Sequence, residues 1–185
     1  MFIIKNNYYL YIENTSSINL DYIKKNKKIS IIYRNNGIQE SYLKLYKFRQ
    51  KCRLKKFKFY VANNFSLAKY CKADGLYLSS YNKKKYPMPK ENLIGSAHNF
   101  SEIYEKKKQG CSTIILSRLF KTSYKNKKDY LGVIKFNLIK KNYQVKLIPL
   151  GGINNANLLK LNLVNSTGLA LLSEVKKKPV ISNRL

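Results

Sequence analysis

Residues 57–78 read FKFYVANNFSLAKYCKADGLYL and contain the clearest strand–helix–strand unit of the sequence. Runs of β-branched and aromatic residues predict strands at Phe57–Val61 and Gly75–Leu78. Between them, Ser66–Cys71 has the pattern of a short helix. Strands joined in this way lie parallel, because a parallel neighbour is reached only through a crossover connection. The unit therefore predicts a parallel sheet covered by helices.

The same alternation recurs along the whole chain. Six more strands are predicted, at Tyr8–Ile12, Ile29–Tyr33, Leu93–Gly95, Thr113–Leu116, Val145–Pro149 and Gly168–Leu171. Four more helices are predicted, at Ile18–Lys25, Glu40–Lys51, Ser101–Gln109 and Asn155–Leu161. Pro87 and Pro89 fall where the crossover after the fourth strand would become helical, so this crossover is predicted to be reduced to a turn. The alternation favours a compact (β/α)8 TIM barrel, although an open doubly wound sheet fits the same pattern.

The helix predicted at Glu40–Lys51 is the most clearly amphipathic. Its apolar side includes Leu45, Phe48 and Cys52, and its basic side includes Arg49. A helix with this pattern packs its apolar side on the core and exposes the other. We therefore expect Arg49 to face solvent.

Length and composition predict one domain. The 185 residues are 44% hydrophobic with no shift in composition, so we expect a single barrel over residues 1–175 followed by a basic tail over residues 176–185. Apolar runs fall short of the roughly 20 residues of a membrane span, and the N-terminus lacks the pattern of a signal peptide. A cytoplasmic protein without a membrane partner is expected. Cys52, Cys71 and Cys111 lack a CxxC spacing and an even count, so we expect them to be reduced and buried.

Positive charge dominates the composition, with 37 Lys and Arg against 9 Asp and Glu and a formal net charge of +28. Such a field can attract nucleic acid, anionic membranes or phosphorylated metabolites. The lysine excess is also what an AT-biased genome produces, together with abundant Asn, Ile and Tyr and no Trp. We favour the compositional interpretation, because the basic clusters are scattered and carry no RNA-binding or zinc-finger signature. A specific nucleic-acid partner is therefore not expected.

Functional groups of a TIM barrel lie where its strands end. Gly151 and Gly152 follow the seventh predicted strand, and Ser173 follows the eighth. Glycines let backbone amides approach a ligand closely, and the loops after strands seven and eight commonly bind phosphate in this fold. A tight turn without a ligand is the competing interpretation. The position of the pair predicts a phosphate site.

Two further loops carry polar candidates. The loop after the sixth strand, residues 117–128, is rich in cations and hydroxyls, which suit phosphate recognition but equally suit a solvated loop. His98, the only histidine, follows the fifth strand, and histidine is a residue type that can serve as a general acid or base. It is equally consistent with a structural role, because Asn99 or Ser101 can cap the next helix, with Glu102 near a capping-box position.

Four segments match the motifs of one enzyme family in order and spacing. Residues 117–125 carry Phe120, Thr122 and Lys125 of its Gly-Pro-x-Phe-Pro-Thr-x-x-Lys motif. Residues 61–80 are similar to its Ile-Asn-Asp-Arg segment and the following Gly-Ala-Asp-Gly-x-His-Leu, in which Tyr77 replaces the histidine. Residues 149–153 look like Ile-Gly-Gly-Ile, and residues 169–173 look like Val-Ala-Val-x-Ser. From about residue 8 to 175, the chain resembles the thiamine-phosphate synthase/TenI family.

This resemblance implies a TIM barrel whose synthase members join a pyrimidine carried on pyrophosphate to a thiazole phosphate with Mg²⁺, releasing pyrophosphate. It implies that Arg34, matching the arginine of Gln-x-Arg-Glu-Lys, contacts pyrophosphate. Lys125, paired with Arg34, would offset the charge of the leaving group. The remaining implied contacts to pyrophosphate, thiazole groups or the thiazole phosphate are Ser96, Thr122, Gly151, Gly152 and Ser173.

The chain departs from the family pattern at the metal site. The lysine of Gln-x-Arg-Glu-Lys is Asn36, the metal-binding aspartate of Ile-Asn-Asp-Arg is Asn63, and the second expected aspartate falls near Asn82. Magnesium is usually held through one or two carboxylates together with substrate phosphates. Glu13, at the end of the first strand, is the alternative carboxylate near the mouth. The resemblance implies Mg²⁺, whereas the residues predict no metal site.

Three functions remain open. The first is synthesis of thiamine phosphate with cations offsetting the charge of the leaving group. The second is a catalytically weakened carrier or regulator that binds a thiazole or thiamine phosphate. The third is a basic nucleic-acid-binding barrel. The TenI branch isomerises a thiazole intermediate with a histidine at the position that Arg118 occupies, so that chemistry does not transfer directly.

Overall fold

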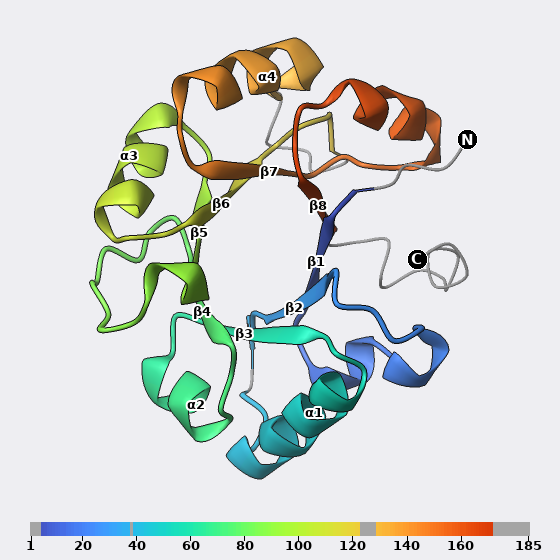
Figure 1. Cartoon of the computed structure of the whole chain (residues 1–185), viewed down its shortest axis with the longest axis vertical. Helices are drawn as coiled ribbons and strands as arrows, with labels where there is room; N and C mark the ends of the chain where they lie inside the picture. The colour runs from blue at the N-terminus through green and yellow to red at the C-terminus, as the bar shows by residue number, and fades with distance from the viewer. Residues whose placement is uncertain (1–4, 38, 123–128, 172–185) are drawn as a thin grey trace.

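The computed structural model describes residues 5–37, 39–122 and 129–171 (Figure 1). In this part of the chain, eight parallel strands form a closed barrel in the order β1 to β8. The strands are β1 (Asn7–Ile12), β2 (Ile29–Tyr33), β3 (Lys58–Ala62), β4 (Gly75–Leu78), β5 (Leu93–Ala97), β6 (Thr113–Ser117), β7 (Lys146–Leu150) and β8 (Gly168–Leu171). The predicted (β/α)8 TIM barrel is confirmed, and the open sheet is excluded.

Each strand pairs with its neighbour in the sequence, and the first pairs with the last. Tyr8 lies opposite Ile29 of β2 on one side and Leu169 of β8 on the other. This closure leaves no unpaired sheet edge and places all the strand ends at one mouth of the barrel.

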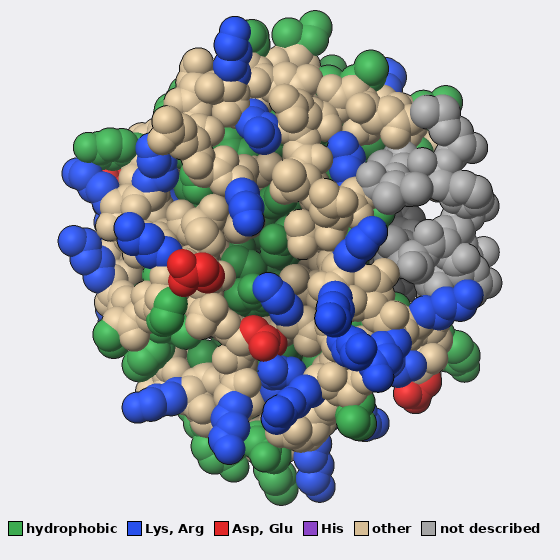
Figure 2. All heavy atoms as spheres, viewed as in Figure 1, with side chains coloured by type: hydrophobic (Ala, Val, Ile, Leu, Met, Phe, Trp, Pro, Cys, Tyr) green, Lys and Arg blue, Asp and Glu red, His purple; other side chains and the backbone are tan. Residues whose placement is uncertain are grey.

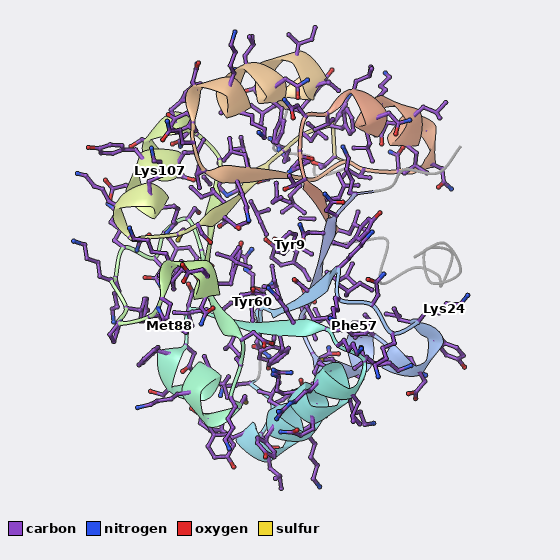
Figure 3. The ribbon with its side chains drawn as sticks, in the orientation of Figure 1. Tyr9, Lys24, Phe57, Tyr60, Met88 and Lys107 are labelled. Carbon is purple, nitrogen blue, oxygen red and sulfur yellow. The ribbon has the colours of Figure 1, made fainter. Side chains whose placement is uncertain are left out.

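The inside of the barrel is an aromatic and β-branched core, separate from the core between strands and helices. Its buried members are Tyr9, Tyr11, Ile32, Tyr60, Tyr77, Ile94, Ile115, Ile148 and Ala170. In Figure 3, Tyr9 and Tyr60 point from β1 and β3 toward the barrel axis. Side chains alternate between the two faces of a strand, so every second residue faces this interior.

Helices surround the barrel, as Figure 1 shows. The α-helices of the described part are α1 (Tyr42–Leu54), α2 (Phe65–Tyr70), α3 (Phe100–Lys108) and α4 (Gly132–Asn142). Side-chain caps begin three of them, because Ser41, Asn64 and Asn99 each accept a hydrogen bond from a backbone N–H of the first turn. The predicted helices at residues 40–51, 66–71 and 101–109 are thereby confirmed with small shifts in their ends.

Two predicted helices were wrong in type. Residues 18–25 form no α-helix: the short 3-10 turn η1 (Thr15–Ser17) precedes the segment, and the segment itself contains the 3-10 turn η2 (Leu20–Tyr22). Ile18 and Ile23 are buried in extended conformations. Their helix-like spacing therefore comes from a loop that packs on the core, and they do not share a helix face. The helix predicted at residues 155–161 is a 3-10 segment, η4 (Asn155–Leu163).

Two further expectations failed. Helix α4 was not predicted, although Phe136 and Ile139 are buried at the three-residue spacing of a helix face. Arg49 was expected to face solvent but is buried, because its guanidinium pairs with Asp74 at 3.0 Å. A charged side chain is accommodated in such a place when it has a partner.

Other expectations were confirmed. After β4 the chain has only the 3-10 turn η3 (Lys90–Asn92), so the crossover is shortened as predicted. Cys52, Cys71 and Cys111 are free and buried, and burial raises the pKa of the Cys52 thiol to about 12. Among the described residues, helices of the length and apolar character needed to cross a membrane are absent.

Candidate functional site

The mouth at which the strands end carries most of the predicted site residues. Ile32 packs inside the barrel, so Arg34, two residues further along, faces the mouth. Ile94 places Ser96 in the same way, and Ser96 is buried. In the closed order of strands, β2 lies opposite β6, so Arg34 faces the loop that follows β6 across the mouth.

Gly151 and Gly152 connect β7 to the loop after β6 by close backbone contact. Both have positive φ angles, +99° and +70°. The Phe120 N–H donates to the Gly151 carbonyl at 3.1 Å. A Cβ on Gly152 would lie 2.4 Å from the Phe120 carbonyl oxygen and 2.5 Å from that of Lys121. Only glycine fits here, because any side chain would collide with backbone.

Arg118 and Thr122 lie beside this glycine turn. The Arg118 guanidinium donates to the Thr122 hydroxyl at 3.3 Å. A Cβ on Gly151 would lie 3.2 Å from Cγ of Arg118, so the arginine stem covers the turn. The structure brings Arg118, Thr122, Gly151 and Gly152 together, and we call these four residues the cradle. A guanidinium beside a glycine turn suits an oxyanion, although phosphate binding stays a prediction. Lys125 and Ser173 lie outside the described residues.

Two tyrosines lie inside the barrel near Arg34. The Tyr11 and Tyr77 ring centroids are 5.5 Å apart and their planes are nearly perpendicular. Burial raises the pKa of Tyr11 well above its ordinary value and Tyr77 adds to this, whereas Arg34 acts to lower it. The Tyr77 hydroxyl hydrogen-bonds with Ser96. The Tyr11 hydroxyl interacts with the Tyr77 phenol, but it has no hydrogen bond of good geometry within the described residues. Arg34 therefore acts electrostatically on a phenol inside the barrel.

His98 and Ser117 form a contact that sequence analysis missed. Ser117 Oγ lies 2.7 Å from His98 Nδ1. Ala97 and Leu116 are paired across β5 and β6, so the next residues of the two strands are neighbours. Knowledge of this register would have been enough to predict that His98 and Ser117 are neighbours. Asn99 caps α3 as predicted, so the loop starts a helix and also places His98 beside Ser117.

Asn63 and Asn82 occupy the positions at which the family resemblance places metal-binding aspartates. The Asn82 side-chain amide donates to the Asn63 side-chain oxygen at 3.0 Å. Mg²⁺ prefers carboxylate oxygens, and these two amides offer it no negative charge, while the Asn63 oxygen already accepts two hydrogen bonds. The nearby Glu13 carboxylate accepts a hydrogen bond from Asn36 at 3.2 Å. Within the described ranges, His, Cys, Asp and Glu do not gather in groups of three. The donor set does not fit the ion.

Positive charge is not confined to the mouth. Figure 2 views the opposite end, where the strands begin and where Figure 3 labels Phe57 directly before β3. Lys and Arg side chains surround this end too. Basic side chains therefore also lie away from the mouth, so the charge is not directed to the mouth alone.

Comparison with known proteins assigns the family. Residues 19–175 match the profile of the family described as thiamine monophosphate synthase. The chain belongs to the thiamine monophosphate synthase family. The resemblance inferred from the sequence motifs is thereby confirmed.

Two curated members of the thiamine monophosphate synthase family match part of the chain. A thiamine-phosphate synthase of Prochlorococcus marinus subsp. pastoris is 30% identical over 120 residues, which cover 62% of this chain and 34% of that protein. A thiamine-phosphate synthase of Chlorobium phaeobacteroides is 24% identical over 132 residues, covering 68% of this chain and 64% of that protein. The match thus spans less than two thirds of each relative.

Solved structures share the fold. The thiamine phosphate pyrophosphorylase from Pyrococcus furiosus has a TM-score of 0.68 at 19% identity, covering 97% of this chain and 91% of that one. The corresponding protein of Bacteroides thetaiotaomicron has a TM-score of 0.58 at 14% identity, covering 91% and 83%. At these identities, the likeness concerns the barrel and not the residues of the mouth.

Proposed function

We propose that this barrel binds phosphorylated thiamine precursors at its mouth and joins pyrimidine pyrophosphate to thiazole phosphate with release of pyrophosphate. The observation that carries the proposal is the cradle, in which Arg118 and Thr122 lie against a glycine turn that admits no side chain. Its position after β6 and β7 is close to the common phosphate site of TIM barrels. Family membership supports phosphorylated thiamine precursors as the class of ligand.

Arg34 is the residue to which we assign the pyrophosphate. It faces the mouth from the end of β2, opposite the β6 loop. When the bond between pyrimidine and pyrophosphate breaks, negative charge grows on the leaving oxygen, and a fixed guanidinium stabilises that charge. We assign a second cation to Lys125 and contacts to the thiazole phosphate to Ser173, on the family motifs alone. We expect residues 1–175 to suffice for this function, in the cytoplasm.

A second candidate function is binding without turnover. The Asn63–Asn82 pair favours it, because the amides do not supply the carboxylates through which Mg²⁺ would be held. A carrier or regulator needs the cradle but no catalytic cation. A nucleic-acid partner is not favoured, since Lys and Arg surround the far end as well.

The deciding experiment supplies purified protein with pyrimidine pyrophosphate and thiazole phosphate and quantifies thiamine phosphate, with and without Mg²⁺. We expect product from the parent and little from Arg34→Ala, Thr122→Ala or Lys125→Ala. Matched controls are Arg53→Ala, in the last turn of α1, and Lys107→Ala, an exposed residue labelled in Figure 3. Both should keep the parent rate. Absence of product, with a melting temperature that thiazole phosphate raises in the parent but not in Thr122→Ala, would support the carrier instead.

A further inference from the structure

We propose that Asn63 and Asn82 form a metal-free clamp between the loops after β3 and β4, and that the buried Lys106 ammonium is the cation that holds this clamp. The proposal concerns ion binding and loop structure, so it holds whether or not the barrel makes thiamine phosphate.

The orientation of each amide is fixed by a backbone donor. The Ser79 N–H donates to Asn63 Oδ1 at 3.0 Å, and the Lys84 N–H donates to Asn82 Oδ1 at 2.9 Å. A backbone N–H can only donate, so both side-chain oxygens are identified without ambiguity. The Asn82 nitrogen therefore donates to the Asn63 oxygen, and the reverse arrangement would lose both backbone contacts.

The Asn63 amide has no capacity left for an ion. Its oxygen accepts two hydrogen bonds, from Ser79 and Asn82. Its nitrogen donates to the Ser79 hydroxyl at 2.7 Å and to the Tyr81 hydroxyl at 3.1 Å. Two lone pairs and two N–H groups are the complete inventory of an amide. A cation would have to break an existing hydrogen bond before the Asn63 oxygen could coordinate it.

Two aspartates could not make this contact. Ionised carboxylates only accept hydrogen bonds, and at this separation they repel each other unless a cation lies between them. Asparagine at both positions removes the repulsion and supplies the N–H that bridges the loops. Asn82 extends the bridge, because the same nitrogen donates to the Tyr86 hydroxyl at 3.1 Å.

Lys106 of α3 contacts the same loop with its ammonium group. Its side chain is fully buried, and its Nζ donates to the Asn82 carbonyl at 2.6 Å and to Gln109 Oε1 at 2.9 Å. Gly95 makes room for it, since a Cβ there would lie 2.8 Å from Cγ of Lys106. Gln109 also donates to the carbonyls of Asn82 and Lys84, both at 2.8 Å. Helix α3 thus holds the loop that replaces the missing crossover helix.

The Lys106 charge also disfavours a second cation nearby. Burial lowers the pKa of Lys106, whereas Cys111, Glu102 and Glu105 act to raise it. Its hydrogen bonds to Asn82 and Gln109 both go to neutral oxygens, so neither of them cancels its charge with a carboxylate. Like charges repel strongly at short range in a partly buried site.

The test measures Mn²⁺ binding by electron paramagnetic resonance, without substrate, in three proteins. They are the parent, the double variant Asn63→Asp/Asn82→Asp, and the control Asn142→Asp/Asn162→Asp, which makes the same charge change at exposed sites. We expect saturable binding only in the first double variant. Its melting temperature in EDTA should fall below that of the control and recover with Mg²⁺. Saturable binding by the parent that Asn63→Ala abolishes would overturn the proposal, as would a first double variant that neither binds Mn²⁺ nor loses stability.

A second arm tests Lys106 in the Asn63→Asp/Asn82→Asp background. Replacing it by Met or, if that protein does not fold, by Gln should tighten Mn²⁺ binding by about tenfold, because a like charge is removed. A purely structural lysine would change the melting temperature and leave the Mn²⁺ affinity unchanged or weaker. That result would remove Lys106 from the proposal.

Discussion

Arg49 of α1 donates to the Asp74 carboxylate at 3.0 Å, at the base of the unit formed by β3, α2 and β4. The guanidinium also donates to the Lys72 carbonyl at 3.1 Å. The other Asp74 oxygen accepts the Phe59 N–H at 2.7 Å. One carboxylate therefore joins a helix, a strand and the turn before the next strand.

Removing the charge of Asp74 should destabilise the barrel. Asp74→Asn leaves the nearly buried Arg49 guanidinium without its counter-charge and weakens the bond to Phe59, so we expect a loss of about 2 kcal/mol in the free energy of unfolding. Urea denaturation checks this. Asp129→Asn, at an exposed position, is the matched control and should have almost no effect. Equal midpoints for the two variants would contradict the role assigned to Asp74.

This pair also shows what the sequence pattern could predict and what it could not. The strands were predicted to within one or two residues, because a buried strand is a continuous run of apolar side chains. The pattern placed Arg49 outside, because amphipathicity is read from residue type and ignores pairing. Asp74 lies 25 positions further along the chain, and only the register of β3 and β4 brings it beside α1.

The candidate site also divides into features that a local sequence pattern predicts and contacts that depend on strand register. Strand ends are local features, so Arg34, Ser96, Thr122 and the glycine pair could be assigned to one mouth from the sequence. The contact of His98 with Ser117 depends on the register between β5 and β6, which no local pattern contains. The Asn63–Asn82 contact is of the same kind, because it joins the loops of two different strands.

Gly152→Ala should cost more stability than Gly132→Ala. Both glycines have φ near +70°, but among the described residues nothing lies within 4 Å of a Cβ on Gly132, whereas one on Gly152 meets backbone at 2.4 Å. Gly132→Ala should lose only about 1 kcal/mol for the left-handed conformation. Gly152→Ala should lose clearly more and should also weaken binding of thiazole phosphate. Urea denaturation and calorimetric titration check the two effects, and equal losses would contradict the close contact in the cradle.

Glu40 should make stability depend on acid pH. Burial acts to raise its pKa, but hydrogen bonds from Lys44 and Thr15 outweigh this and lower it. A lowered folded pKa stabilises the protein above the unfolded pKa, and this contribution is lost as pH falls through the folded value. The parent should therefore lose more stability than Glu40→Gln between about pH 6 and pH 3. Glu91→Gln, at an exposed site, should follow the parent; identical curves for all three proteins would contradict the effect.

Ser117 and His98 should act as one unit in ligand binding. Their 2.7 Å hydrogen bond fixes the residue that precedes Arg118 of the cradle, so losing either partner releases the same constraint. A neutral hydrogen bond contributes about 1 kcal/mol, so Ser117→Ala and His98→Gln should each weaken thiazole phosphate binding about fivefold. The double variant should be no weaker than the singles, because partners in one contact are not additive. Calorimetric titration of the four proteins completes this cycle, and losses that multiply in the double variant would mean that the two side chains reach the ligand independently.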